Sequence, residues 1–335
     1  MKSSLTALDL FCGAGGLSIG LHAAGFQTVA AVEIGSDACA TYQNAFPETK
    51  LLQADIRTVN FREWRGIDLV AGGPPCQPFS TGGLRRGRND VRDFLPDFVR
   101  AILEAEPRAF LMENVPGLAA FGDYLHTALA PLMDLYRISG PHIVNAADYG
   151  VPQSRRRMII IGCRDDRVFQ FPVPNLAARV PAGAVLTLKP LGEPNPSKIV
   201  YCKAPDLRPN PYHGQLFNGG GRAVNLDAPA PTILASAGGN KTHFLDCGGH
   251  VPAYHCHLKA GGRPYVGELP DARRLTVRES AALQTFPAGY DFLGSRSSQY
   301  TQVGNAVPAK LAEALGNALD EHMAARSVRR KLKAA

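Results

Sequence analysis

The stretch Thr6-Ala-Leu-Asp-Leu-Phe-Cys-Gly-Ala-Gly-Gly16 carries the clearest fold signal in the chain. Residues 6–11 predict a short apolar strand, the glycines at 13, 15 and 16 a tight turn, and residues 17–24 the helix that follows. Glycines at such a turn let the backbone approach a bound cofactor closely, although a tight turn without a ligand has the same composition. The dinucleotide pattern G-x-G-x-x-G would need glycine where the chain has Ser18, so the spacing disfavours NAD.

The same alternation of strand and helix continues to about residue 165. We expect further strands at 28–33, 51–56, 67–72, 109–113 and 158–162, and helices at 94–105, 117–134 and from an N-cap at Ser36 to about 46. Short, nearly continuous apolar strands separated by helices favour a parallel sheet that is covered on both faces. The sequence therefore predicts an α/β fold with a doubly wound, mostly parallel sheet.

The composition changes after about residue 167. Residues 168–272 hold most of the Pro, Gly and His and show no sustained helical period, which predicts a smaller, loop-rich, mostly β unit. Helical pattern then resumes with a capping box at Thr276–Glu279. Pro308 is placed as the first residue of a helix to about 325, before a basic tail at 326–333.

Length and composition bound the class of protein. The 335 residues suggest about two domains. No run of 18 apolar residues occurs, so no transmembrane helix is expected, and Asp9 interrupts the only apolar stretch that could act as a signal peptide. Seven scattered cysteines fit a reducing cytosol, and the net charge of +7 suits a polyanionic partner or serves only solubility. The His/Cys group at 247–257 matches no zinc spacing, so we expect no metal.

Chemistry-bearing residues follow several of the expected strands. The glycine turn, Glu33 and Asp55 together form a nucleoside pocket without a pyrophosphate cradle, which suits S-adenosylmethionine. Cys76 lies between prolines after the fourth strand, and Glu113 ends the fifth. Most cysteines are inert small hydrophobes, but this position at the carboxyl edge of a parallel sheet favours a nucleophile with Glu113 as proton donor. The spacing around Cys76 excludes a zinc deaminase, which needs H-x-E and P-C-x-x-C.

Two arginine clusters flank this edge of the predicted sheet. Arg155, Arg156 and Arg157 precede the sixth strand, and further arginines occupy the glycine-rich run 81–93. Charge clusters are usually solvated faces, but guanidinium groups at this edge also suit phosphate.

These features, in this order, resemble the DNA (cytosine-5) methyltransferase family. The matching motifs are the cofactor turn at 8–16, Glu33, Asp55, the Pro-Cys motif at 74–80, Glu113-Asn114-Val115, Gln153-x-Arg155-x-Arg157, Arg273-x-Leu-Thr-Val-Arg-Glu-Ser and Gln302-Val-Gly-Asn305-Ala-Val-Pro308. They cover both ends of the chain and leave 168–272 as the variable target-recognition region. The resemblance implies a Rossmann-like, S-adenosylmethionine-dependent methyltransferase that acts on duplex DNA.

The resemblance also implies a mechanism. The thiolate of Cys76 would add to C6 of a flipped-out cytosine while Glu113 protonates N3, and the resulting enamine would take the methyl group at C5. Loss of the C5 proton and of Cys76 would then release 5-methylcytosine and S-adenosylhomocysteine. Arg155 and Arg157 would hold the site, one near the base and the other near the DNA backbone.

The resemblance carries further residues onto this chain. The expected cofactor-binding set is Phe11, Gly13, Gly15, Gly16, Glu33, Asp55, Ile56, Pro75, Asn305 and Ala306, and the expected DNA-binding set is Ser80, Arg85, Arg86, Arg88, Gln153 and Thr232. Gly304-Asn305 is expected to form a turn, and the segment 302–316 to fold back on the first strand. The catalytic domain would then be discontinuous, 1–167 plus 288–335, with the recognition domain and hinge at 168–287.

Partners and rival functions follow from the same resemblance. The family usually acts as a monomer in the bacterial cytoplasm, and a cognate restriction endonuclease acting separately is a candidate partner. A tRNA cytosine-5 methyltransferase is the nearest rival, although the recognition segment of ~100 residues favours DNA readout in the major groove. A binding protein without turnover is a second rival, which the Cys76–Glu113 pair disfavours because a binder needs no nucleophile.

Overall fold

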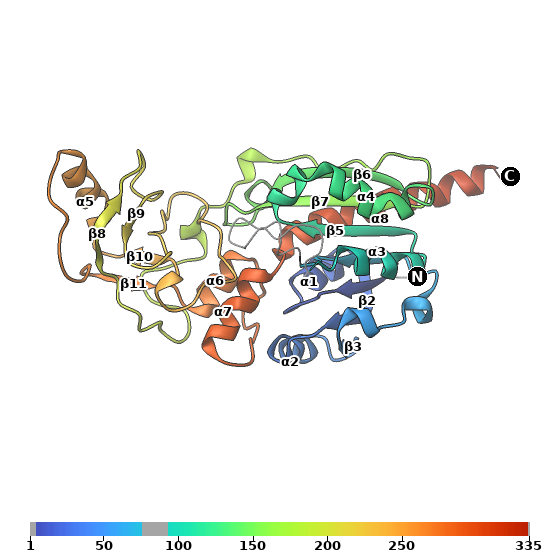
Figure 1. The fold of residues 1–335 in the computed structure, drawn as a ribbon, viewed down its shortest axis with the longest axis horizontal. Helices are drawn as coiled ribbons and strands as arrows, with labels where there is room; N and C mark the ends of the chain where they lie inside the picture. The colour runs from blue at the N-terminus through green and yellow to red at the C-terminus, as the bar shows by residue number, and fades with distance from the viewer. Residues whose placement is uncertain (1–4, 76–92, 334–335) are drawn as a thin grey trace.

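The computed structural model describes residues 5–75 and 93–333 of the chain, and side chains as far as residue 325. Its centre is a seven-stranded sheet with the strand order β3-β2-β1-β4-β5-β7-β6 (Figure 1). The strands are β1 Leu5–Leu10, β2 Phe26–Glu33, β3 Lys50–Gln53, β4 Leu69–Gly72, β5 Ala109–Asn114, β6 Arg137–Asn145 and β7 Arg156–Cys163. The helices around it are α1 Gly16–Ala23, α2 Ser36–Ala45, α3 Leu95–Ala105, α4 Gly122–Met133 and the C-terminal α8 Ala309–Lys333.

Helices cover both faces of this sheet. Side chains of successive strand residues point to opposite faces, so each strand contributes to two separate cores. On one face, α3 and α4 pack on strand residues such as Leu10 and Phe110. On the other, α1 and α8 pack on alternate residues such as Leu69 and Ile159. The predicted doubly wound α/β architecture is confirmed.

The last two strands differ from the prediction. Strands β1 to β5 run parallel, whereas β7 is antiparallel to both of its neighbours, β5 and β6. Strand β6 was not predicted, because Gly140-Pro141 interrupts its apolar pattern. The structure accommodates this dipeptide where the register shifts between Ser139 and His142, and β6 lies at the sheet edge, where proline is tolerated. With β6 in place, a hairpin back to β7 fixes the opposite direction.

Residues 168–287 form the loop-rich region that the sequence predicted, which we call the recognition region. It holds two two-stranded antiparallel sheets, β8 Tyr201–Asp206 with β9 Gln215–Phe217 and β10 Phe244–Asp246 with β11 Ala272–Arg274. It also contains helix α5, His250–Lys259, which was not expected in a segment without a sustained helical period. Helices α6 Val277–Leu283 and α7 Arg296–Asn305 lie between these small sheets and the seven-stranded sheet (Figure 1). The capping box at Thr276–Glu279 is present as predicted.

Some predicted helix ends are wrong by short distances. Helix α2 begins at Ser36 with Gly35 as its N-cap, so Ser36 is not the cap. The predicted turn at Gly304-Asn305 is the last part of α7 instead, and the chain leaves the helix at Ala306. Helix α8 begins one residue after Pro308 and continues through the backbone of the predicted basic tail.

The C-terminal helix packs on the first helix of the chain. A Cβ atom on Gly20 of α1 would lie 2.3 Å from the carbonyl oxygen of Ala309 and 2.4 Å from the Cβ of Ala312, closer than any real contact. Leu311, Leu315 and Leu319 share one apolar core with α1. This packing supports a discontinuous catalytic domain in which the end of the chain belongs with its beginning.

Candidate active site

The glycine turn holds the carboxylate of Glu33 at the carboxyl edge of the sheet. Phe11, Gly13 and Gly15 have φ angles of 59°, 54° and 82°, which bend the chain sharply between β1 and α1. One carboxylate oxygen of Glu33 accepts a hydrogen bond from the backbone N–H of Gly13 at 3.0 Å. The other accepts from the N–H groups of Ile34 and Gly35 at 2.9 and 2.7 Å. Glu33 is thereby fixed beside the turn, as the sequence predicted for a ribose-binding acid.

The segment after α7 packs against the glycine turn at Gly16. A Cβ atom on Gly16 would lie 2.4 Å from the carbonyl oxygen of Val307 and 3.1 Å from the Cβ of Ala306, so only glycine fits there. Asn305 is exposed at the end of α7. The structure thus brings the predicted cofactor residues 305 and 306 to the first turn, although almost 300 residues separate them in sequence.

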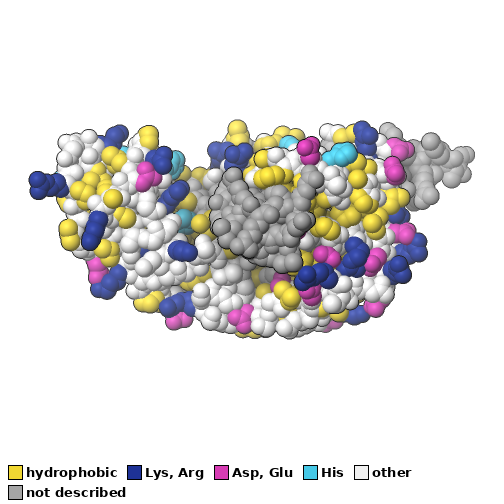
Figure 2. All heavy atoms as spheres, in the orientation of Figure 1, with side chains coloured by type: hydrophobic (Ala, Val, Ile, Leu, Met, Phe, Trp, Pro, Cys, Tyr) yellow, Lys and Arg dark blue, Asp and Glu magenta, His cyan; other side chains and the backbone are white. Residues whose placement is uncertain are grey.

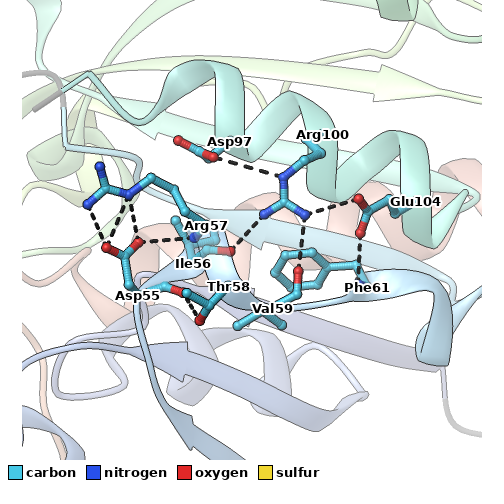
Figure 3. A network of polar contacts seen from close by, with 9 residues as sticks. All are labelled: Asp55, Ile56, Arg57, Thr58, Val59, Phe61, Asp97, Arg100 and Glu104. Carbon is cyan, nitrogen blue, oxygen red and sulfur yellow. Dashed lines mark hydrogen bonds and ion pairs between the residues drawn. The ribbon is translucent and has the colours of Figure 1, made fainter. Parts of the chain in front are cut away.

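Asp55 lies two residues beyond the end of β3, at the start of the short helix η1, Ile56–Thr58. Its carboxylate caps η1 and binds the guanidinium of Arg57, with Nη2 to Oδ2 at 2.5 Å (Figure 3). Hydrogen bonding from Arg57 lowers the pKa of the Asp55 carboxyl. Asp55 is therefore an ionised acceptor, but in this structure Arg57 is bound to it.

A polar network that the sequence did not predict anchors residues 56–61, which follow Asp55, to α3. Arg100 donates hydrogen bonds to the carbonyl oxygens of Ile56 at 2.7 Å and Val59 at 3.0 Å (Figure 3). Glu104, one helical turn later, binds Arg100 at 3.0 Å and accepts the N–H of Phe61 at 2.9 Å. The signal in the sequence is the Arg100–Glu104 pair at i, i+4 spacing, but its long-range partners could not be read from it.

Two aromatic rings meet beside the glycine turn. The ring of Phe94, just before α3, meets the ring of Phe11 edge to face at 5.9 Å between centroids. The guanidinium of Arg57 lies over Phe94 at 5.2 Å from the ring centroid. Phe94 was not among the predicted site residues, since only the fold places it beside Phe11.

A buried polar cluster lies beneath the glycine turn. Ser18 donates a hydrogen bond to the carboxylate of Asp9 at 2.6 Å and also contacts the hydroxyl of Tyr42 at 2.7 Å. Burial raises the pKa of Asp9 to about 7 and also raises the pKa of Tyr42. Ser18, where a dinucleotide-binding turn would have glycine, is thus a hydrogen-bonding residue beneath the turn.

The predicted catalytic acid lies at the same edge of the sheet. Glu113 is the last residue but one of β5 and has 8% of its surface exposed, and its carboxylate binds Nε of Arg157 from the neighbouring β7 at 2.7 Å. A Cβ atom on Gly73 would lie 3.0 Å from the other carboxylate oxygen of Glu113. Glu113 therefore adjoins Gly73, three residues before Cys76 in the sequence, and Arg157 is paired with Glu113 there. Cys76, Ser80, Arg85, Arg86 and Arg88 themselves lie outside the described residues.

Two residues predicted at this site are buried and form hydrogen bonds with the backbone of distant segments. Arg155, 1% exposed, donates to the carbonyl oxygens of Ile233 at 2.9 Å and Gly304 at 2.8 Å, and burial lowers its pKa. Gln153 is fully buried, donating to the carbonyl oxygen of Leu283 and accepting the N–H of Ile233. Both side chains join the catalytic sheet to the recognition region. The expected DNA contact of Gln153 and the expected contact of Arg155 near the base or the DNA backbone stay predictions, which this buried arrangement does not favour.

Thr232, predicted to contact DNA, lies where these two parts meet. Its hydroxyl donates to the carbonyl oxygen of Ser154 at 2.7 Å. Lys and Arg side chains are scattered over the visible face of the recognition region and of the catalytic domain, with Asp and Glu side chains among them (Figure 2).

Two general features bear on the class of the protein. Within residues 5–75 and 93–333, no three His, Cys, Asp or Glu side chains are grouped as metal ligands. None of the helices in the described part combines the length and apolarity needed to cross a membrane.

Comparisons with known proteins agree with this geometry. The family model for C-5 cytosine-specific DNA methylase matches residues 5–200 and 229–321. The Type II methyltransferase M.AplI of Arthrospira platensis is 34% identical over 343 residues, covering 95% of this chain and 86% of its own. M.NgoMIV of Neisseria gonorrhoeae, also described as a Type II methyltransferase, is 32% identical, with 93% and 96% covered.

Solved structures share the fold. A putative DNA modification methyltransferase encoded within an Escherichia coli prophage is 25% identical, with a TM-score of 0.68 over 95% of this chain and 99% of that one. A mutant of DNMT2 from Spodoptera frugiperda has a TM-score of 0.71 at 20% identity, over 95% of this chain and 100% of its own. With the motifs gathered at one sheet edge and a family match over both ends of the chain, this protein belongs to the C-5 cytosine-specific DNA methylase family and is a DNA (cytosine-5) methyltransferase.

Proposed function

We propose that this enzyme transfers a methyl group from S-adenosylmethionine to C5 of a flipped-out cytosine within a specific duplex DNA sequence, through a covalent bond between Cys76 and C6. The observation that carries the proposal is the Glu113–Arg157 pair, in which the Glu113 carboxylate adjoins Gly73, three residues before Cys76 in the sequence. The same sheet edge holds Glu33 on the glycine turn. A donor pocket and a nucleophile–acid pair side by side are what methyl transfer to a pyrimidine carbon requires.

The pocket fits S-adenosylmethionine. Phe11 offers a partly exposed aromatic ring for the adenine, Glu33 an oriented carboxylate for the ribose hydroxyls, and Asp55 an ionised acceptor for the adenine amino group. Within residues 5–75 and 93–325, no atom lies within 4 Å of a Cβ atom at Gly13, apart from the chain neighbours of that glycine, so this part of the turn leaves room for a ligand. Gly15, Gly16, Ile56, Pro75, Asn305 and Ala306 complete the proposed lining. When bound, S-adenosylmethionine supplies an electrophilic methyl group on its sulfonium.

The protein residues activate the cytosine. The Cys76 thiolate forms a bond to C6, and Glu113 holds N3 and delivers a proton to it, so electron density moves to C5. Arg157 keeps the Glu113 carboxyl oriented toward the residues around Cys76. After C5 has gained its methyl group, the C5 proton passes to a base, the Cys76–C6 bond breaks and the N3 proton returns to Glu113. These steps restore the aromatic ring, the thiolate and the Glu113 acid.

The substrate must leave the DNA stack to reach this edge. Flipping one nucleotide costs a few kcal/mol of unstacking and unpairing, which contacts to the DNA backbone and neighbouring bases must offset. Thr232 and the arginines at 85, 86 and 88, with Ser80, are proposed for such contacts. Because its relatives are Type II methyltransferases, we also propose action as a monomer in the bacterial cytoplasm, with a restriction endonuclease for the same sequence as separate partner.

Trapping and label transfer test the proposal together. Incubation with S-adenosylmethionine carrying a labelled methyl group should label duplex DNA and leave tRNA unlabelled. Duplex DNA in which 5-fluorocytosine replaces cytosine should become covalently attached, because fluorine at C5 cannot leave as a proton does. Cys76→Ala should abolish both labelling and attachment, whereas Cys256→Ala, which alters an exposed cysteine on α5, should change neither. Label on tRNA alone, or methylation by Cys76→Ala above trace level, would refute the proposal.

A further inference from the structure

The segment Asn218–Arg222 of the recognition region is a glycine-rich loop whose shape is fixed from below. Gly219 has a φ of 73°, and a Cβ atom there would lie 2.0 Å from the carbonyl oxygen of Asn240. At Gly221 a Cβ atom would lie 1.9 Å from the carbonyl oxygen of Thr242. The loop backbone therefore lies directly on residues 240–242, an approach that only glycine permits.

A buried arginine holds the start of this loop. Arg274 of β11 is 1% exposed, and its guanidinium donates to the side-chain oxygen of Asn218 at 2.8 Å and to the carbonyl oxygen of Thr242 at 2.8 Å. Burial lowers the pKa of Arg274 to about 10, so the side chain is still charged at neutral pH. Burying a charged side chain is costly, and here that side chain holds one loop in place. We infer that the function of the protein depends on the position of this loop.

A buried histidine holds the end of the loop. His243 is 6% exposed, and its Nδ1 accepts the backbone N–H of Arg222 at 3.0 Å. Because Nδ1 is an acceptor, Nε2 carries the proton and donates to the carbonyl oxygen of Thr232 at 3.1 Å. Burial lowers the pKa of His243, and the positive charges of Arg222 and Arg274 lower it further, so the neutral form is favoured.

The same contacts connect the loop to the catalytic sheet. Thr232 binds the carbonyl oxygen of Ser154 at 2.7 Å, and the next residue, Ile233, binds Arg155 and Gln153. A continuous path of hydrogen bonds thus leads from the backbone of Arg222 to the residues that precede Arg157. These hydrogen bonds fix the position of the loop relative to the edge of the sheet where the cytosine must react.

The side chain at the end of this fixed loop is exposed and available. Arg222 lines an open cavity of about 440 Å³ together with Asp206, Arg208 and His213. Arg208 is paired with Asp206 at 2.9 Å, whereas Arg222 makes no ion pair with any carboxylate of the described residues. The loop therefore presents one free guanidinium on a rigid backbone.

We propose that Asn218–Arg222 is a preformed DNA-contact loop, in which Arg222 binds two hydrogen-bond acceptors of the DNA and His243 and Arg274 are positioning residues. This inference rests on the proposed action on duplex DNA. A guanidinium fork matches two neighbouring acceptor atoms, which DNA offers as phosphate oxygens or as the O6 and N7 atoms of guanine. A loop that is already ordered loses little conformational freedom on binding, so the contact contributes to affinity in full.

Substitution of Arg222 in the full chain tests the contact. Arg222→Ala and Arg222→Lys are compared with Arg65→Ala, which removes an exposed arginine paired with Glu106 beside the opposite end of β4. The measurements are cofactor affinity, KM for duplex DNA, the salt dependence of DNA affinity, and the sequence context of methylated cytosines in a random-sequence plasmid library read by bisulfite sequencing. We expect Arg222→Ala to raise KM for DNA by roughly 10-fold or more, with cofactor affinity unchanged.

The two sources of acceptors give different results. If Arg222 binds a guanine edge, Arg222→Lys relaxes the methylated context at one base position. If it binds phosphate, the context stays the same, and Arg222→Ala lowers the slope of log affinity against log salt by about 0.9. An Arg222→Ala enzyme that matches Arg65→Ala in KM, context and slope overturns the inference. Absence of DNA methylation by the unaltered enzyme overturns the proposed function itself, a separate outcome.

A second variant tests the positioning role of His243. His243→Ala should raise KM for DNA toward the value of Arg222→Ala while leaving cofactor affinity and kcat within about twofold. The double variant should bind DNA no worse than Arg222→Ala alone, because both changes remove one contact. His243→Asn, whose side-chain oxygen can accept the Arg222 N–H, should restore part of the loss. Additive effects of the two substitutions, or a fall in cofactor affinity, would show that His243 has only a general structural role.

Discussion

The most informative substitution is Arg155→Met, because it separates the sequence-based role of this residue from the structural one. Arg155 and Arg157 were expected to hold the site, one near the base and the other near the DNA backbone. The guanidinium of Arg155 instead binds the carbonyl oxygens of Ile233 and Gly304 in the protein interior. Methionine keeps most of the side-chain length and removes both hydrogen bonds. If the structural role is right, the variant loses stability as well as activity.

The magnitude follows from the contacts that are lost. Each hydrogen bond from a charged donor contributes about 1.5–3 kcal/mol, so two contribute about 3–6 kcal/mol. Removing the buried charge also removes its desolvation cost, which offsets part of this loss. A net destabilisation of about 2–4 kcal/mol remains, and at ~2–4 °C per kcal/mol it lowers Tm by roughly 5–15 °C.

Thermal unfolding followed by circular dichroism measures this change directly. The matched control is Arg156→Met, which alters the exposed arginine at the next position, the first residue of β7, and should leave Tm within about 1 °C. Cofactor and DNA binding are measured at a temperature where both variants are folded. An Arg155→Met protein that melts with Arg156→Met but has lost turnover would refute the structural assignment and restore the predicted contact with substrate.

Three further predictions follow from the fold. Gly20→Val places a side chain against the backbone of Ala309, so we expect the Tm of the variant to fall by at least 5 °C; an unchanged Tm would contradict the packing of α8 on α1. Burial raises the pKa of Asp9 to about 7 in the folded protein, so the free energy of unfolding of the unaltered protein falls as the pH rises from about 4 to 7. The Asp9→Asn variant lacks this loss, so its free energy of unfolding should exceed that of the unaltered protein by an amount that grows over this range. Urea titrations that show a constant difference would refute this. Removal of everything after Ser298 should abolish cofactor binding measured by calorimetry, because residues 305–307 close the glycine turn, whereas a folded truncation with normal affinity would show that the turn suffices alone.

Local sequence patterns determined most of the fold. The strand, glycine turn and helix at the start of the chain, the alternation that follows, and the capping box at Thr276–Glu279 were all predictable, because turn chemistry and apolar periodicity act between residues a few positions apart. Glu33 could be placed for the same reason, since it ends a strand beside the turn. The parallel sheet then brings such strand ends to a common edge.

Tertiary structure alone decided the rest. The direction of β7 depends on β6, whose Gly140-Pro141 conceals it in the sequence. Arg155 and Gln153 look like surface residues of a basic run, and only the packing of the recognition region against the sheet buries them. A guanidinium can bind phosphate, a carboxylate or a backbone carbonyl, and the sequence does not say which of these lies within reach. That choice is made by segments 78 to 149 residues apart, because burial and hydrogen-bond partners depend on which surfaces the whole chain brings into contact.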